Sequence, residues 1–397
     1  MKRLIAMLLA LVMVLSLAAC GKAQEDQLVD NDSQRDGQIM LGQEGLEVEV
    51  NEAEEHLDSA EACNSGNWEA MFVPVEVEGR ANNMLDVDLT PTAEELEAMK
   101  AEPAYGKAVM RYQTDGCSSP LNMADYLGYY AEAGLTTEVV KGNSYTEALG
   151  TNHAQVAIGH IATMLVPITN GVDLTCVGGI HIACKSLYVL ADSPYKTTED
   201  LKGTNIAVPN GIGASDYNIT SLMLDDDGIN PQTDVTLVQV SADASVSAME
   251  NGEISAVLLT DTYAYGMVKD GKLRCISSML DSDYSEVSVC CAIAMNRTFV
   301  QENPVHAKKI TQAIQKAGAY MRANPEDATD ILLEQGWNAG DREMNIMINK
   351  SLQYGMTAEN AGANLREIVE RYIRLGLISS MDNADEVMEL AWIPCCD

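Results

Sequence analysis

The sequence predicts an α/β fold, and two patterns predict it. From Lys107 onward, short apolar runs alternate with stretches whose apolar residues recur at helical spacing. Within this part, the apolar run 204–209 leads into a glycine loop at 210–213 and then into a helical pattern over 215–224. Strands that alternate with helices favour a mostly parallel sheet flanked by helices. The segment with this pattern, about 290 residues, suits one two-lobed protein or two small domains.

The glycine loop is a candidate for ligand binding. Ser215 is a good N-cap, so the helix is expected to begin there. Glycines let a ligand come close to the backbone, and the free N–H groups of a first helical turn then point at it. A helix start that binds no ligand is the alternative interpretation.

Other candidate contacts lie where predicted strands end, because sheets of this kind bind ligands beyond the carboxyl ends of their strands. The expected ligand-binding residues are Cys117, Ser118, Ser119, His160, His181, Asn210, Gly211, Gly213, Ala214, Ser215, Asp216 and Asp261. His153 and His306 are interpreted as surface residues.

Residues 1–20 have the order of a bacterial lipoprotein signal peptide. Two cations, Lys2 and Arg3, precede an apolar run that ends in the sequence Leu-Ala-Ala-Cys. We expect cleavage before Cys20 and a lipid on its sulfur, which would anchor the protein on the extracytoplasmic face of the cell membrane. An ordinary secretory signal with an incidental cysteine is the alternative.

The next segment, residues 21–61, is predicted to be a disordered linker. Between residues 24 and 61 there are thirteen acidic residues and one basic residue, with little apolar periodicity. Residues 62–104 form an extension of uncertain structure, in which 68–77 suits a strand and 91–96 suits a capped helix start. The net charge of −34 makes nucleic acid an unsuitable partner.

A resemblance covers most of the folded region. The stretch DSPYKTTEDLKGTNIAVPNGIGASDY, followed by INPQTDVTLVQVSADASVSAMENGEISAVLLTD, resembles the substrate-binding proteins of nitrate, sulfonate and taurine ABC transporters and the related thiamine-pyrimidine-synthase-like proteins. The resemblance extends from about residue 107 to about residue 328. It implies a periplasmic-binding-protein-like (type II) fold with a ligand cleft between two lobes. Lobe 1 would comprise residues 105–194 and 291–397, and lobe 2 residues 195–290.

The charge of the solute is where the resemblance and the residues differ. The candidate loops contain no Arg or Lys, and Asp216 would compete with an anion for the positive end of its helix. These residues favour a nitrogen heterocycle, such as a thiamine precursor, or an amine over the nitrate or sulfonate that the resemblance suggests.

Cysteines and histidines supply a second possibility. The chain has ten cysteines, of which Cys117, Cys184, Cys290 and Cys291 lie near the expected cleft. Thiolate and imidazole groups bind soft metals, which makes His181, Cys184, Cys290 and Cys291 candidate metal ligands. Buried free thiols and disulfides are the alternatives. The stretch SVCCAIAMNRTFVQENP resembles a cysteine-rich strand of fungal thiamine-pyrimidine synthases that is tied to iron, but it retains only two of those cysteines.

Together these patterns predict a lipid-anchored solute-binding protein that closes about a hinge and delivers its solute to the permease and ATPase of an ABC importer. No cofactor and no catalytic residues are expected, since the sequence lacks nucleophile, phosphate-loop and zinc-protease motifs. The alternatives are a thiamine-pyrimidine-synthase-like enzyme and a receptor for a metal or metal chelate.

Overall fold

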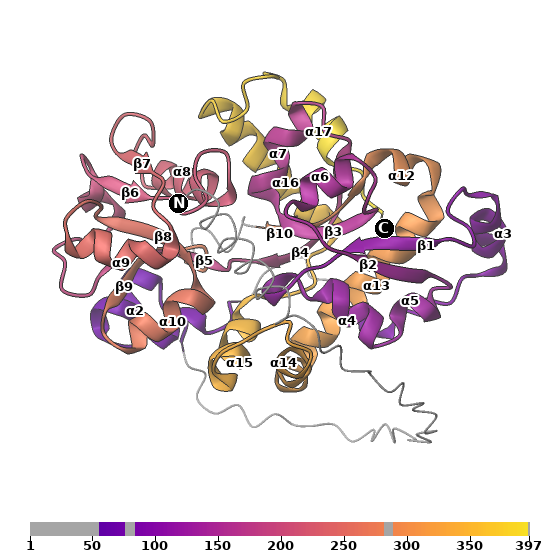
Figure 1. Cartoon of the computed structure of the whole chain (residues 1–397), viewed down its shortest axis with the longest axis horizontal. Coiled ribbons are helices and arrows are strands. Elements are labelled where there is room, and N and C mark those ends of the chain that lie inside the picture. Colours follow the sequence, from indigo (N-terminus) through magenta and orange to yellow (C-terminus); the bar gives the residue numbers. More distant parts are fainter. Residues whose placement is uncertain (1–54, 76–83, 282–288, 396–397) are drawn as a thin grey trace, which may run out of the picture. The chain divides into compact units, whose positions relative to one another are not determined.

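The computed structural model describes residues 55–75, 84–281 and 289–395. The strands form two five-stranded sheets, each flanked by helices (Figure 1). This is the predicted α/β fold with two lobes. Cys20, the signal peptide and residues 21–54 of the predicted linker lie outside the described residues.

The first sheet has the strand order β2-β1-β3-β10-β4. Strands β1, β2 and β3 are parallel, whereas β10 runs antiparallel to both of its neighbours, β3 and β4. The strands are β1 (Ala108–Tyr112), β2 (Thr136–Val140), β3 (Val156–His160), β4 (Leu174–Ile182) and β10 (Val289–Asn296). Every residue of β4 and β10 is buried, which explains why these segments are almost continuously apolar.

The second sheet repeats this arrangement with the order β7-β6-β8-β5-β9. Strands β6, β7 and β8 are parallel, and β5 is antiparallel to both β8 and β9. The strands are β5 (Lys185–Leu190), β6 (Asn205–Ala207), β7 (Thr236–Val238), β8 (Ala256–Thr260) and β9 (Leu273–Ser278). In both sheets, therefore, one antiparallel strand occupies the fourth place.

The chain passes from the first sheet to the second within two residues. Strand β4 ends at Ile182 and β5 begins at Lys185. The two residues between them, Ala183 and Cys184, have positive φ angles of 61° and 121°, which non-glycine residues rarely adopt. Because β5 already belongs to the second sheet, that sheet begins at Lys185, ten residues before residue 195, where lobe 2 was predicted to begin. The lobe boundaries themselves stay predictions.

Helices of the first lobe cover both faces of its sheet and include the C-terminal part of the chain. α13 and α16 contact β4, and residues beyond α17 extend the same strand edge through a bridge between Cys176 and Trp392. The helices are η3 (Gly116–Ser118), α4 (Pro120–Tyr126), α5 (Tyr129–Glu132), α6 (Tyr145–Gly150), α7 (Ile161–Thr169), α12 (Arg297–Glu302), α13 (Pro304–Ala323), α14 (Pro325–Glu334), α15 (Arg342–Ser351), α16 (Ala358–Arg374) and α17 (Ala384–Ala391).

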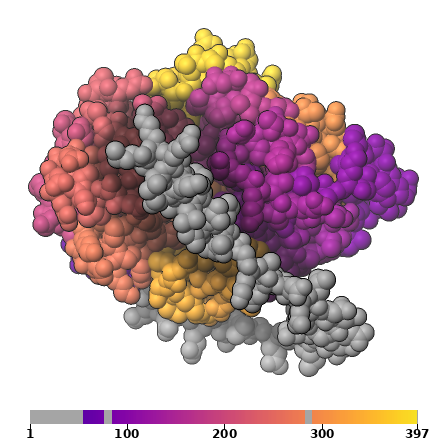
Figure 2. Space-filling view, in the orientation of Figure 1, coloured from indigo at the N-terminus to yellow at the C-terminus, as the bar shows by residue number. Residues whose placement is uncertain are grey.

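Helices of the second lobe are η4 (Thr198–Leu201), α8 (Ser215–Asp226), α9 (Ala242–Glu250) and α10 (Asp261–Lys269). Helix α15 contacts α10 as well as α13 and α14. It therefore connects the C-terminal helices to the second lobe, and in the space-filling view orange-yellow residues of this part of the chain reach the surface next to the salmon region (Figure 2). None of the described helices is long and apolar enough to cross a membrane.

The N-terminal extension packs on both lobes. Helix α2 (Ser59–Ser65) lies against β9, while α3 (Ala93–Ala101) lies against α13 (Figure 1). α3 begins with the predicted capping box, formed by Thr92 and Glu95. The other two elements are η1 (Trp68–Phe72) and η2 (Met84–Asp86).

Three local predictions were wrong in this extension or at its contacts with α13. Residues 59–61, predicted as linker, belong to α2 because Asp281 accepts hydrogen bonds from the backbone N–H and hydroxyl of Ser59. The expected strand near Trp68 is a 3-10 helix, whose Trp68 ring packs edge-on against Tyr265. His306 is buried rather than exposed, since its Nδ1 lies 2.5 Å from the carboxylate of Glu102.

Candidate functional site

A cavity of about 470 Å³ opens between the two sheets, within the range typical of small-molecule sites. Both lobes line it, together with α15 and the loop before it. The described lining residues are Asp115, Gly116, Cys117, His160, Cys184, Thr260, Thr262, Gly336, Trp337, Asn338, Ala339, Ile348, Asn349 and Leu352. Cys117 follows β1, His160 ends β3 and Thr260 ends β8, so the carboxyl ends of parallel strands meet here.

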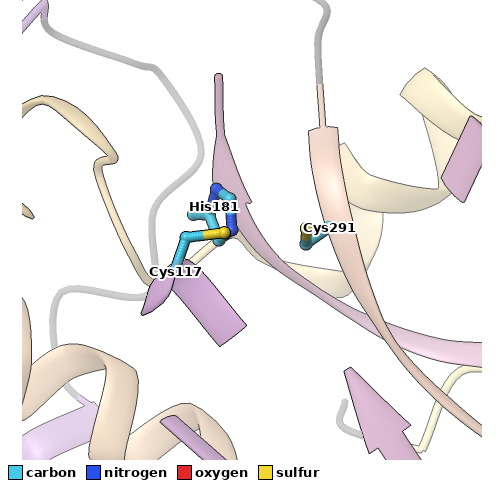
Figure 3. Close-up of side chains that lie close together, drawn as sticks. All are labelled: Cys117, His181 and Cys291. Atoms are coloured by element: carbon cyan, nitrogen blue, oxygen red, sulfur yellow. The ribbon is translucent and has the colours of Figure 1, made fainter. Parts of the chain in front are cut away.

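One side of the cavity is a thiol–imidazole cluster, which we define as Cys117, His160, His181, Cys184, Cys290 and Cys291. Strand register explains how it forms, because Cys291 on β10 pairs with His160 on β3 and with His181 on β4. Two groups of three converge within it, Cys117–His181–Cys291 and His160–Cys184–Cys290, and in each group the potential ligand atoms all lie within 4.8 Å of one another. Figure 3 shows the first group, with the side chains of Cys117 and His181 adjacent and Cys291 facing them from β10.

Several contacts join the two groups. The Sγ atoms of Cys184 and Cys290 are 3.2 Å apart, and the Sγ of Cys290 is 3.2 Å from Nδ1 of His160. The Sγ of Cys291 lies 3.8 Å from the same nitrogen. All four cysteines are free thiols in this structure. They are therefore available as ligands or nucleophiles.

The environment of the cluster shifts its protonation. Burial and the charge of Lys185 lower the pKa of His160 to about 4, so that its imidazole is neutral at pH 7. Hydrogen bonds with Cys184 and Cys291 lower the pKa of the Cys117 thiol well below its usual value. Burial raises the pKa of Cys290, and the interaction with Cys117 raises the pKa of Cys291. Cys117, the thiol whose pKa is lowered, lines the cavity.

The second lobe holds buried oxygen and nitrogen groups that are bonded to one another, behind the residues Thr260 and Thr262 with which it lines the cavity. Nζ of Lys185 forms a buried ion pair with Asp216, and the other carboxylate oxygen of Asp216 accepts hydrogen bonds from the N–H and the amide of Asn210, at 3.0 and 2.6 Å. The glycine loop itself contains no cation, but β5 places Lys185 beside it. The carboxylate of Asp216 is therefore already neutralised.

Asp261 is also bonded within the protein. Its carboxylate accepts a hydrogen bond of 2.7 Å from the hydroxyl of Tyr188. Burial raises the pKa of Asp261 to about 6, although hydrogen bonds from Ser186 and Tyr188 act in the opposite direction. Asp261 is 1% exposed and is the first residue of α10, directly after Thr260 in the chain.

The glycine loop has the predicted form but a different cap. Gly211 and Gly213 both have φ angles above 80°, and Ile212 between them is 83% exposed. The N-cap of α8 is Ala214 rather than Ser215, because the hydroxyl of Ser215 is turned toward Lys185, which donates to it at 3.2 Å. The N–H of Ala214 donates to the carbonyl of Gly211.

Of the twelve predicted contact residues, Cys117 and His160 line the described cavity. His181 lies in the cluster behind them, and the role of the others as contacts stays a prediction: Ser118, Ser119, Asn210, Gly211, Gly213, Ala214, Ser215, Asp216 and Asp261. Asp115 and Thr262 lie in strand-end loops that the sequence reasoning had included in the cleft, whereas it missed the loop 336–339 with Trp337. The only signal for that loop is Asp341, which caps α15 and so indicates a preceding turn.

The chain resembles known proteins in sequence and in fold. The family model described as NMT1/THI5 like matches residues 117–328. A Brucella abortus (strain 2308) protein named "Putative binding protein" is 23% identical over 213 residues, which cover 53% of this chain and 65% of that protein. The match thus spans just under two thirds of that relative.

Solved structures show the same fold at low identity. The aliphatic sulphonate binding protein SsuA of Escherichia coli has a TM-score of 0.58 and 17% identity, covering 72% of this chain and 92% of that one. The Candida albicans CA3427 gene product has a TM-score of 0.59 and 13% identity, covering 72% and 96%. The nitrate-binding protein NrtA of Synechocystis PCC 6803 has a TM-score of 0.54 and 15% identity, covering 72% and 85%.

The family match covers more than half of the chain, and the two sheets with their crossover reproduce the periplasmic binding protein fold. The chain belongs to the NMT1/THI5-like family.

Proposed function

We propose that this protein is an extracytoplasmic solute-binding protein of an ABC importer, which closes its two lobes on a small polar solute. The observation that carries the proposal is the cavity of about 470 Å³ lined by both lobes at the ends of their strands. The short crossover at Ala183 and Cys184 supports hinge closure, since a few residues with unusual φ angles can absorb a change of lobe orientation. Binding proteins for sulfonate and nitrate share the fold.

We further propose that a lipid on Cys20 anchors the protein to the outer face of the cell membrane. The basic, apolar, Leu-Ala-Ala-Cys order of residues 1–20 supports this. The acidic segment after Cys20 would then space the folded part from the membrane, because like charges extend a chain. The partners are a membrane permease and its ATPase.

A nitrogen heterocycle or an amine fits the cavity better than an anion. The described lining contains one charged residue, Asp115, and no Lys or Arg. Lys185, the nearby cation, is already paired with Asp216. Trp337 offers a ring for stacking, and Asn338 and Asn349 offer both donors and acceptors. Closure would bring the predicted contacts of the glycine loop to the same solute.

A titration of the purified protein with a panel of solutes tests the proposal. Thiamine-precursor pyrimidines and small amines should raise the melting temperature and bind in calorimetry more tightly than nitrate, taurine or alkyl sulfonates. Trp337→Ala should weaken heterocycle binding roughly tenfold, because aromatic stacking contributes about 0.5–1.5 kcal/mol beyond burial. Trp392→Ala, far along the chain on the edge of β4, is the matched control. Tight binding of anions alone, insensitive to Trp337, would contradict the proposed solute class.

A further inference from the structure

We propose that the thiol–imidazole cluster binds a thiophilic metal ion, Zn²⁺ or Cu⁺, and that a nitrogen-donor solute in the cavity completes the coordination of that ion. The proposal deepens the proposed solute-binding function and rests on it for the role of the solute. The metal site itself is argued from the cluster alone.

The tautomer of His181 is the first argument. Its Nδ1 is 2.9 Å from the carbonyl oxygen of Ile182, an acceptor, so Nδ1 carries the proton and donates it. In the neutral imidazole Nε2 is then the acceptor. It is fully buried and has no hydrogen-bond partner of ordinary geometry among the described residues, although the thiol of Cys117 lies close to the ring. An orphaned buried acceptor is costly, whereas a histidine that donates one ring N–H to a backbone carbonyl and offers the other nitrogen is the usual form of a metal ligand.

The convergence of ligand atoms is the second argument. Bonds of about 2.3 Å to sulfur and about 2.0–2.1 Å to nitrogen put the donors of a tetrahedral ion roughly 3.6–3.8 Å apart. The ligand atoms of Cys117, His181 and Cys291 already lie within 4.8 Å of one another. Small rotations of these side chains would therefore close the site. Soft thiolate with imidazole selects Zn²⁺ or Cu⁺ over Mg²⁺ and Ca²⁺.

The position of the cluster at the cavity wall is the third argument. Cys117, His160 and Cys184 line the cavity, while His181, Cys290 and Cys291 lie buried behind them. Each group of three supplies three protein ligands, which leaves a coordination position for a solute, as in zinc sites that bind exogenous ligands. Each thiol that binds the ion loses its proton to the buffer.

The cluster also touches the connection between the lobes. Cys184 is one of the two crossover residues between β4 and β5, and Cys290 is the second residue of β10. Their sulfur atoms are in contact at 3.2 Å. An ion held here would fix the crossover relative to β10, so metal binding should favour one lobe orientation over others.

The test is metal binding by the reduced, metal-free protein. Zn²⁺ and, under anaerobic conditions, Cu⁺ should bind in competition with a chromogenic chelator, and native mass spectrometry should show the stoichiometry, while Mg²⁺ should not compete. Cys291→Ser and His181→Gln should each weaken binding more than about tenfold, since even the loss of a supporting outer-shell group costs 10–100-fold. Cys176→Ser is the matched control, because Cys176 is a buried free thiol on β4 outside the cluster.

A second measurement uses the wild-type protein, so that it does not depend on whether the variants fold. In the wild-type protein, bound metal should slow alkylation of Cys117 and Cys184, read by peptide mass spectrometry, and leave Cys63 unaffected. No metal binding by the reduced protein, or equal binding by Cys291→Ser and Cys176→Ser, would overturn the proposal. A Cys184–Cys290 disulfide in protein that binds no metal would identify a redox pair instead.

The solute panel separates this inference from the proposed function. Heterocycles that bind the metal-free protein as tightly as the metal-loaded protein would support the receptor function. They would contradict the proposal that the solute coordinates the bound metal ion. If metal binds and heterocycles bind only the loaded protein, both hold. If metal binds and no solute binds in either state, the cluster is a metal site and the proposed receptor for organic solutes is wrong.

Discussion

The two strand–helix units that meet at the cavity are built alike but differ in chemistry. In the first lobe, β3 ends at His160 and α7 follows at once; in the second, β8 ends at Thr260 and α10 begins with Asp261. The first unit lies among thiols and imidazoles, and the buried Nε2 of His181 has no hydrogen-bond partner in the part of the chain that the structure describes. The carboxylate of the second unit is already bonded to Tyr188.

This difference separates groups that stabilise the fold from groups that await a ligand. A buried charge whose partner lies inside the protein, such as Lys185 with Asp216, keeps the folded state stable, because removal of either partner leaves an uncompensated buried charge. An acceptor left without a partner is stabilised only when something binds. The second lobe therefore bonds its buried charged groups internally, whereas the first lobe holds a ring nitrogen that, we propose, takes part in recognition.

Removing a charge from the second lobe should have the largest effect. Lys185→Met leaves Asp216, which is 1% exposed, without its cation. We expect a loss of about 3–5 kcal/mol in the free energy of unfolding, measured by urea denaturation at pH 7.5.

Two controls accompany this variant. Adding Asp216→Asn removes the uncompensated charge but keeps an acceptor for Asn210, and should restore much of the loss. Arg342→Met breaks an exposed pair with Asp330 and should change stability little. If Lys185→Met is no worse than Arg342→Met, the buried pair does not support the lobe as described.

Asp261 should give the second lobe a pH dependence. Unfolded aspartate ionises near 3.9, whereas folded Asp261 keeps its proton up to a pKa of about 6. Between these values the folded state binds more protons, so the free energy of unfolding should fall by roughly 3 kcal/mol as pH rises from about 4 to about 6, and then level off.

Asp261→Asn should flatten that slope while keeping an acceptor for Tyr188. Stability is measured by urea denaturation at half-unit pH intervals. Burial also raises the pKa of Asp281 to about 6. Asp281 therefore adds its own part of the pH dependence of stability, and Asp281→Asn removes that part. A slope unchanged by Asp261→Asn would show that this carboxyl group ionises normally in the folded state.

Local patterns predicted much of the fold. The strand, glycine loop and helix around residues 204–226 were recognisable because each signal lies within a few residues of the next. The capped helix start predicted over 91–96 was confirmed for the same reason, and its cap is a capping box of Thr92 and Glu95. Trp68 misled the prediction because its packing partner, Tyr265, lies almost two hundred residues away.

The candidate site was harder to predict because it depends on register and crossover. The sequence placed His181 and Cys291 near a cleft, but their alignment requires β10 to insert antiparallel between β3 and β4. No local pattern specifies that insertion. Likewise, the candidate loops contain no Lys or Arg in the sequence, although β5 directs Lys185 to Asp216, 31 residues further along.

Two tyrosines allow the smallest and most direct comparison of the lobes. The hydroxyl of Tyr188 donates to the carboxylate of Asp261 at 2.7 Å, whereas that of Tyr145 donates to the backbone carbonyl of His160 at 3.3 Å. At pH 8, where Asp261 is ionised, Tyr188→Phe should cost about 1.5–3 kcal/mol and Tyr145→Phe about 0.5–1.5 kcal/mol, since hydrogen bonds to charged groups are the stronger ones. At pH 4.5 Asp261 is protonated, and the two losses should converge. Urea denaturation of both variants at the two pH values measures this difference, and equal losses at pH 8 would mean that the charge on Asp261 is not held by Tyr188.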